Sequence, residues 1–149
     1  MTVTIAALQM CSGTDPVRNV EAMRRLVREA AAKGAVYVQT PEMTGALQRD
    51  RAGLRAILRM EADDLVVAAA AELAAELGIH LHVGSTAIAL ADGKVANRGF
   101  LFGPDGGQVC SYDKIHMFDV DLDNGESWRE SAVYSPGSVA RMAELPFAK

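Results

Sequence analysis

Cysteine is scarce in this sequence. Its 149 residues contain two, Cys11 and Cys110, which lie far apart. They form neither the dense framework of a disulfide-stabilised secreted domain nor the close pairs typical of a structural zinc site. We therefore expect both thiols to be reduced.

Long apolar runs are also missing. The longest, Leu65 to Ala71, is too short to span a bilayer and is followed by Glu72. The opening residues, Met1 to Ile5, lack the cationic segment, long apolar stretch and small-residue cleavage site of a secretory signal. The sequence therefore favours a cytoplasmic protein with no membrane partner.

The sequence has no block of basic residues. Fifteen Lys and Arg residues against nineteen Asp and Glu residues give a formal net charge of −4. The sequence therefore has no run of basic residues that could bind along a phosphate backbone. Nucleic acid is therefore not an expected partner.

Half of the residues are hydrophobic, enough for one substantial core in a single domain. Residues 3–10 are a short, nearly all-apolar run, typical of a strand buried on both faces. Asp15 and Pro16 mark a helix start and Gly34 its end, and between them apolar residues recur at helical spacing, at Val17, Val20, Met23, Val27 and Ala30. Residues 35–39 form a second strand, so the opening third predicts a parallel βαβ unit.

The remainder changes from a helical to a strand pattern. Residues 46–77 read as two helices broken near Glu61 to Asp64, with Gly78 as the end. Gly-rich turns then separate three strand-like runs of an antiparallel meander, at 80–90, 94–102 and 107–113. After a turn at Pro136-Gly137, another strand is expected from near Val139. The sequence therefore predicts an α/β fold: a mixed β-sheet with helices on one face, in one domain over residues 1–149.

Three charged residues could carry chemistry. Glu42 follows the end of a buried strand, where open α/β sheets place ligands, and could act as a general base. Lys114 lies among apolar and aromatic residues at a strand end, where a partly desolvated ammonium could stabilise an oxyanion. Glu130 could orient that lysine. Taken singly, each also fits an ordinary surface role: a solvated loop glutamate, an edge-strand lysine and a surface glutamate.

Two other arrangements remain open. His80 and His82 alternate along a strand and face the same side, which allows a two-histidine metal site in a metal-dependent hydrolase, although no third ligand is evident. Cys110 could be a nucleophile if His116 and Glu42 approached it, although a cysteine in a strand is more commonly a small buried hydrophobe. Cys11 fits packing for the same reason.

Four separated motifs, taken in order, resemble the carbon-nitrogen hydrolase (nitrilase) superfamily. They are Ile5 to Met10, Pro41-Glu42, Tyr112 to Asp119, and Glu130-Ser131 followed by Pro136-Gly137. The resemblance runs the length of the chain. It is closest to the Nit branch, which includes ω-amidase and the amidase acting on deaminated glutathione.

The resemblance implies a fold, a reaction and roles for the three charged residues. The fold would be a four-layer α-β-β-α sandwich, of which this chain would furnish about half. The reaction would be hydrolysis of the amide bond of a small carboxamide by a Glu-Lys-Cys triad, with no metal or organic cofactor. Glu42 would be the general base, Lys114 the oxyanion-stabilising cation and Glu130 the second glutamate that positions substrate and lysine.

The chain departs from the family pattern at the nucleophile. In the family, a cysteine in a Cys-Tyr-Asp-like context follows the lysine motif on the next strand but one, whereas Cys110 precedes Lys114 and no cysteine follows it. The resemblance therefore implies a truncated or incomplete form, inactive by itself. The alternative is a non-catalytic interaction module that pairs through its uncovered sheet. We also expect a homo-oligomer.

Overall fold

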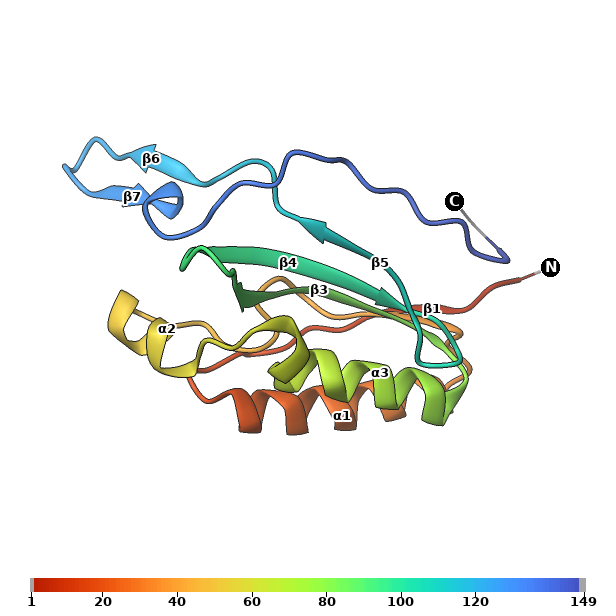
Figure 1. Cartoon of the computed structure of the whole chain (residues 1–149). Coiled ribbons are helices and arrows are strands. Elements are labelled where there is room, and N and C mark those ends of the chain that lie inside the picture. The colour runs from red at the N-terminus through yellow and green to blue at the C-terminus, as the bar shows by residue number, and fades with distance from the viewer. Residues whose placement is uncertain (1, 148–149) are drawn as a thin grey trace.

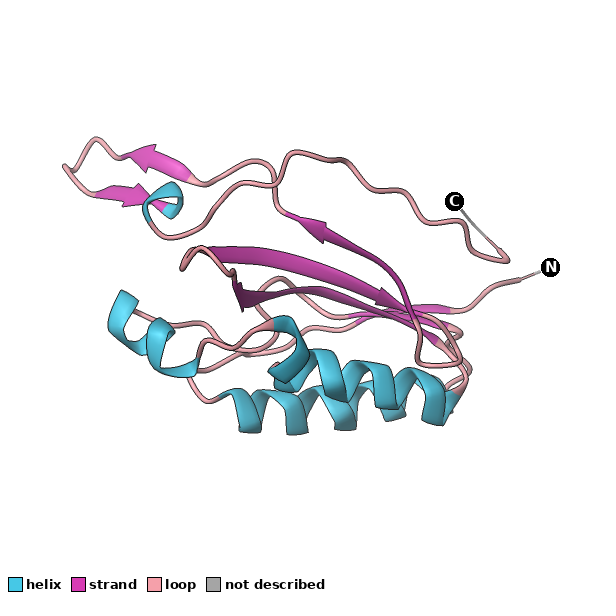
Figure 2. Cartoon of the chain, viewed as in Figure 1, coloured by secondary structure: helices cyan, strands magenta, loops and turns pink. Residues whose placement is uncertain are grey.

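A computed structural model describes residues 2–147 and shows a layered α/β arrangement (Figure 1). A five-stranded sheet has the order β1-β2-β3-β4-β5, and the two long helices cover one of its faces (Figure 2). Among the described residues, no helix is long and apolar enough to cross a membrane. The fold class predicted from the sequence, a mixed sheet with helices on one face, is confirmed.

The opening βαβ unit forms as predicted. Strands β1 (Ile5–Ala7) and β2 (Tyr37–Gln39) are parallel, and α1 (Pro16–Ala32) joins them. The Asp15 carboxylate accepts hydrogen bonds from the first backbone N–H groups of α1, which stabilises the helix start. Of the five apolar positions expected to face the core, four are buried, and only Val17, 55% exposed, is not.

The first strand differs from its prediction in length and burial. It spans only three of residues 3–10, and Ile5 is 66% exposed. Burial on both faces is therefore wrong, and the topology gives the reason. Strand β1 is at the edge of the sheet, and the helices cover only one of its faces, where Ala6 packs partly buried against the core.

The helical region contains three pieces rather than two. They are α2 (Arg51–Ile57), the 3-10 turn η1 (Glu61–Asp63) and α3 (Leu65–Leu77). The predicted break and the end at Gly78 are confirmed, and Gly78 has the left-handed conformation (φ 63°) that favours glycine. The predicted start at residue 46 is wrong, because Asp50 caps α2 and leaves residues 46–50 outside it.

The meander and the parallel unit share one sheet. Strand β3 (His80–Ala89) is parallel to β2 and antiparallel to β4 (Val95–Phe102), which pairs with β5 (Gln108–Asp113). The core lies between this sheet and helices α1 and α3. Its largest fully buried side chains include Phe100, Met23, Leu73 and Leu81.

Beyond β5 the chain departs most from the prediction. A small hairpin of β6 (Asp119–Asp121) and β7 (Ser127–Arg129) was not expected, and the 3-10 turn η2 (Glu130–Ala132) follows it. The strand predicted from Val139 is wrong: residues 136–144 have no regular structure. They lie beside the sheet on the face opposite the helices (Figure 1). The Gly137 N–H donates to the Lys114 carbonyl oxygen at 2.9 Å, which attaches the start of this segment to the end of β5.

The helix-free face carries an apolar groove of about 760 Å³ beneath this C-terminal segment. Strands β1 to β5 supply one wall and the segment supplies the other; the lining residues include Ile5, Tyr37, His82, Cys110, Tyr112, Leu145 and Phe147. This groove is separate from the candidate site described next, since none of the three predicted site residues lines it.

Candidate active site

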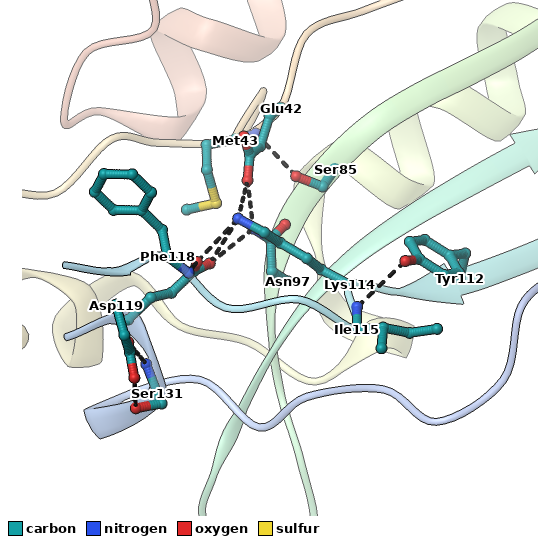
Figure 3. A network of polar contacts seen from close by, with 11 residues as sticks. Glu42, Met43, Ser85, Asn97, Tyr112, Lys114, Ile115, Phe118, Asp119 and Ser131 are labelled. Carbon is teal, nitrogen blue, oxygen red and sulfur yellow. Dashed lines mark hydrogen bonds and ion pairs between the residues drawn. The ribbon is translucent and has the colours of Figure 1, made fainter.

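The three charged residues singled out in the sequence lie together, and Figure 3 shows Lys114 reaching toward Glu42. The Lys114 Nζ atom is 3.1 Å from Oε1 of Glu42 and 2.9 Å from Oε2 of Glu130. Glu42 follows β2, Lys114 follows β5, and Glu130 begins η2. Elements 72 residues apart in sequence thus place one ammonium between two carboxylates.

A tight turn after β2 positions Glu42. The Thr40 and Thr44 hydroxyls are buried and 2.7 Å apart, and Met43 adopts a positive φ of 54°. The Met43 N–H donates to the Ser85 hydroxyl at 3.0 Å, which ties the turn to β3. The Glu42 side chain itself is 59% exposed, so it faces open space.

The end of β5 positions Lys114. Its backbone N–H donates to the Asn97 carbonyl oxygen on β4 at 2.9 Å. One residue earlier, Asp113 accepts two hydrogen bonds from the Arg98 guanidinium at 2.6 and 2.9 Å. Arg98 also contacts Glu61 at 2.7 Å, so β4, β5 and η1 are joined at this point. The lysine therefore projects from a part of the sheet fixed on both sides.

The electrostatics of the site keep its charges in place. Burial acts to lower the pKa of Lys114, but hydrogen bonds and attraction from Glu130 and Glu42 outweigh it and raise that pKa. Burial acts to raise the pKa of Glu130, but bonds from the Phe118 N–H, Lys114 and Asn97 outweigh it and lower that pKa. The ammonium and the Glu130 carboxylate therefore stabilise each other as ions.

Asn97 belongs to this site and was missed in the sequence. It is 3% exposed, and its Nδ2 atom donates to Oε1 of Glu42 at 2.8 Å and to Oε1 of Glu130 at 3.4 Å. A polar residue within the otherwise apolar start of β4 was the available signal, since buried polar side chains normally serve a specific partner.

A cleft of about 490 Å³ opens beside these residues. Its apolar walls come from the turn after β2, from α2 and from the β6–β7 region, and include Met43, Leu54, Phe118, Trp128 and Val133. Tyr134 also lines it, and burial together with the charges of Glu130 and Glu42 raises the pKa of Tyr134 to about 12. A small organic molecule fits a cleft of this size and lining.

The alternative nucleophile is not brought to this site. Cys110 lines the groove on the helix-free face, not the cleft beside Glu42. His116 and Cys11 are both exposed, and neither lines the cleft. The arrangement of Cys110, His116 and Glu42 considered from the sequence is therefore not supported by the structure.

The two histidines share a face as expected but have aromatic rather than metal-binding surroundings. The His82 Nδ1 atom lies 2.7 Å from the Tyr37 hydroxyl, and the His80 ring packs edge-on against Phe147 at 5.4 Å between centroids. Burial lowers the pKa of His82, which keeps it neutral. Across residues 2–147 there is no cluster of three or more His, Cys, Asp or Glu side chains suited to a metal ion, so the metal-hydrolase alternative is not favoured.

Comparisons with known proteins agree with this arrangement. The sequence model of the carbon-nitrogen hydrolase family matches residues 4–149. The chain is 30% identical over 148 residues to deaminated glutathione amidase of Yersinia enterocolitica, covering 97% of this chain and 51% of that protein. It is also 30% identical over 145 residues to omega-amidase NIT2 of Danio rerio, with the same coverage of each. The chain thus spans about half the length of these curated relatives.

Solved structures show the same fold. Nit3 of Saccharomyces cerevisiae, a member of the nitrilase superfamily, matches with a TM-score of 0.80 at 18% identity, over 98% of this chain and 52% of that one. The Caenorhabditis elegans NitFhit protein matches with a TM-score of 0.78 at 23% identity, over 90% of this chain and 33% of that one. Since the family match extends over nearly all of its residues, the chain belongs to the carbon-nitrogen hydrolase family.

Proposed function

We propose that this chain supplies the general base and the oxyanion-stabilising cation of an amidase that acts on small carboxamides. The observation that carries the proposal is the contact of Lys114 Nζ with Glu42 and Glu130 beside a cleft of about 490 Å³. Because the relatives include amidases, we infer that the bond hydrolysed is the carbon-nitrogen bond of an amide. The thiol nucleophile would come from outside these 149 residues.

In the proposed reaction, Glu42 removes the proton of the thiol as sulfur attacks the amide carbonyl carbon. Lys114 stabilises the negative charge that develops on the carbonyl oxygen. The tetrahedral intermediate collapses to a thioester as the nitrogen takes the proton from Glu42 and leaves as ammonia. Glu42 then deprotonates a water that attacks the thioester, which releases the carboxylic acid and regenerates the thiol.

The geometry suits this division of roles. The Glu42 side chain is 59% exposed, so a nucleophile can reach it. The Glu130 side chain is only 14% exposed and holds Lys114 in position through their ion pair. A general base must lie within hydrogen-bond reach of the proton it takes, and only the more exposed carboxylate is open to a second chain segment. Glu130 is therefore the positioning carboxylate.

The test is ammonia release from small carboxamides, including α-ketoglutaramate. It compares this chain with a polypeptide extended through the next cysteine encoded downstream. We expect release only from the extended polypeptide, and none after that cysteine is replaced by alanine. Equal activity of the two polypeptides would refute the external nucleophile, and inactivity of both would refute the proposed function.

Matched variants of the extended polypeptide test the assigned roles. E42Q and K114M should each lower turnover at least about 100-fold. E126Q and K94M change the same residue types at exposed positions outside the cleft and should retain it. Loss of turnover in all four would indicate a general effect of charge.

A further inference from the structure

The two oxygens of the Glu42 carboxylate have unequal polar contacts among residues 2–147. Oε1 accepts from Lys114 Nζ at 3.1 Å and from Asn97 Nδ2 at 2.8 Å. Within residues 2–147, Oε2 accepts no hydrogen bond. An ionised carboxylate has about two acceptor positions on each oxygen, so Oε1 is fully used and Oε2 is open.

The orientation of the Asn97 amide is determined by its neighbours. Its nitrogen faces two carboxylates, at 2.8 and 3.4 Å, and only an N–H group can donate there. Its Oδ1 atom is buried and finds no donor in the described part of the chain. A buried acceptor without a partner is unfavourable for folding, so this amide is not explained by stability alone.

We propose that Asn97 is a positioning residue: its amide N–H groups hold Oε1 of Glu42 and Oε1 of Glu130, leaving Oε2 of Glu42 as the proton-accepting oxygen. This inference rests on the proposed function for the role of Glu42. Lys114 alone could let the carboxylate turn and present either oxygen. A second donor on the same oxygen prevents that rotation and keeps the two glutamates in register.

The first test does not need activity. The pKa of the Glu130 carboxyl is measured by carbon NMR in this chain and in N97L, which has nearly the same side-chain volume. We expect that pKa to rise in N97L, because a neutral N–H donor to the ionised form is lost. The melting temperature should change by less than about 4 °C. An unchanged Glu130 pKa in a folded variant would overturn the proposal.

A second measurement uses the unmodified chain, so it decides the question even if N97L does not fold. The side-chain Nδ2 protons of Asn97 should shift with pH, with the same midpoint as the Glu130 carboxyl. Protons that do not respond to this titration would also overturn the proposal.

The control for N97L is N19L, which removes another buried amide. The Asn19 amide donates to the carbonyl oxygens of Gly13 and Gly45 at 3.0 and 2.8 Å. N19L should lower the melting temperature and leave the Glu130 pKa unmoved.

The third test uses the active extended polypeptide. A hydrogen bond to a charged group corresponds to about a 10- to 100-fold change in rate, so N97L should lower kcat/KM by about that factor, mainly through kcat. The acidic limb of its pH profile should move to higher pH, because the pKa of the Glu130 carboxyl rises when the ionised form loses an N–H donor. Unchanged kinetics would refute the positioning role, whereas an inactive unmodified polypeptide would refute only the proposed function and leave the NMR result standing.

Discussion

At the scale of residues, the site contains more negative than positive side chains. One ammonium, Lys114, contacts two carboxylates, Glu42 and Glu130, so this cluster carries one net negative charge when all three are ionised. The neutral Asn97 amide supplies the additional donors that the pair of carboxylates requires. Removing either kind of donor should therefore raise the pKa of the Glu130 carboxyl.

The first prediction concerns K114M. Loss of the ammonium should raise the pKa of Glu130, because a main cause of its lowered value disappears. In the active extended polypeptide, turnover should fall at least about 100-fold, the effect of removing one oxyanion donor. Carbon NMR and ammonia release measure the two effects. K94M, on an exposed side chain, is the control, and a Glu130 pKa that stays put in K114M would contradict the interaction.

The second prediction is the pH dependence of stability. Since the folded-state pKa of Glu130 lies below its ordinary value of 4.5, its contribution is fully present above pH 4.5. The contribution is lost as the pH falls from there through the lowered folded value. The free energy of unfolding of E130Q should therefore decline less below pH 4.5 than that of the unmodified chain, as measured by urea denaturation. E126Q serves as the control at an exposed glutamate and should follow the unmodified chain; parallel curves for E130Q would disprove the linkage.

The sequence predicted three of the four residues of this cluster. Glu42, Lys114 and Glu130 stand out because charge follows apolar segments in a known order of motifs. Asn97 does not, since a single amide in a strand has no periodic signal and its partners are 55 and 33 residues away. The sequence offers Cys110 as a candidate nucleophile because it carries a thiol. Only the structure shows that Cys110 lines the groove on the helix-free face.

At the scale of elements, the turn that holds Glu42 depends on a close approach between β2 and β3. A Cβ atom on Gly84 would overlap the Thr40 carbonyl oxygen and lie 2.6 Å from the Pro41 carbonyl oxygen. These are backbone atoms and cannot move aside without moving the turn. The absence of a side chain at Gly84 therefore sets the position of Glu42.

The third prediction follows from this contact. G84A should destabilise the chain by about 1–3 kcal/mol, the usual cost of overpacking, and should lengthen the contact between Lys114 and Glu42. Chemical denaturation and a crystal structure would measure these effects. The control is G13A: a Cβ on Gly13 meets nothing within 4 Å, so the change should stay within about 0.5 kcal/mol. Equal stability of the two variants would contradict the close approach.

Some elements could be predicted because their signals are local. The break before α3 depends on Asp64, whose carboxylate accepts from Val66 N at 2.9 Å and Val67 N at 3.1 Å. The β6–β7 hairpin has only its turn residues, Asn124-Gly125, as a local signal. Each of its three-residue strands has a single apolar residue, Val120 paired with Trp128, which is too short a pattern to predict a strand. An ion pair between Arg129 and Asp121 at 2.6 Å helps join the two strands. Polar cross-strand contacts of this kind appear only after the chain is folded.

At the scale of the whole molecule, the two faces of the sheet are unequal. Helices α1 and α3 cover one face of the sheet, and a segment without regular structure lies over part of the other (Figure 1). That second face keeps an apolar groove of about 760 Å³. Ile5 on β1 is 66% exposed there. Exposed apolar surface of this kind favours association.

The fourth prediction is that the 149-residue chain self-associates. Its average mass in sedimentation equilibrium should rise with concentration, and I5E should weaken the association because it places a charge on the helix-free face. V17E is the matched control: Val17 is 55% exposed, but it lies on α1. A monomer at all concentrations, or an equal effect of the two variants, would argue against pairing through this face.

The sequence separation of 72 between Glu42 and Lys114 also bears on how the molecule folds. Strands β3, β4 and β5 are joined by short turns, whereas the parallel pairing of β2 with β3 must close a much longer loop. In pulse-labelled hydrogen exchange, we expect the Phe100 amide to become protected before the Thr40 amide, which donates to the His82 carbonyl oxygen at 2.9 Å. The reverse order would exclude this pathway. On that pathway the contact of Lys114 with Glu42 forms only after β2 has joined the meander, so it reports a late step of folding.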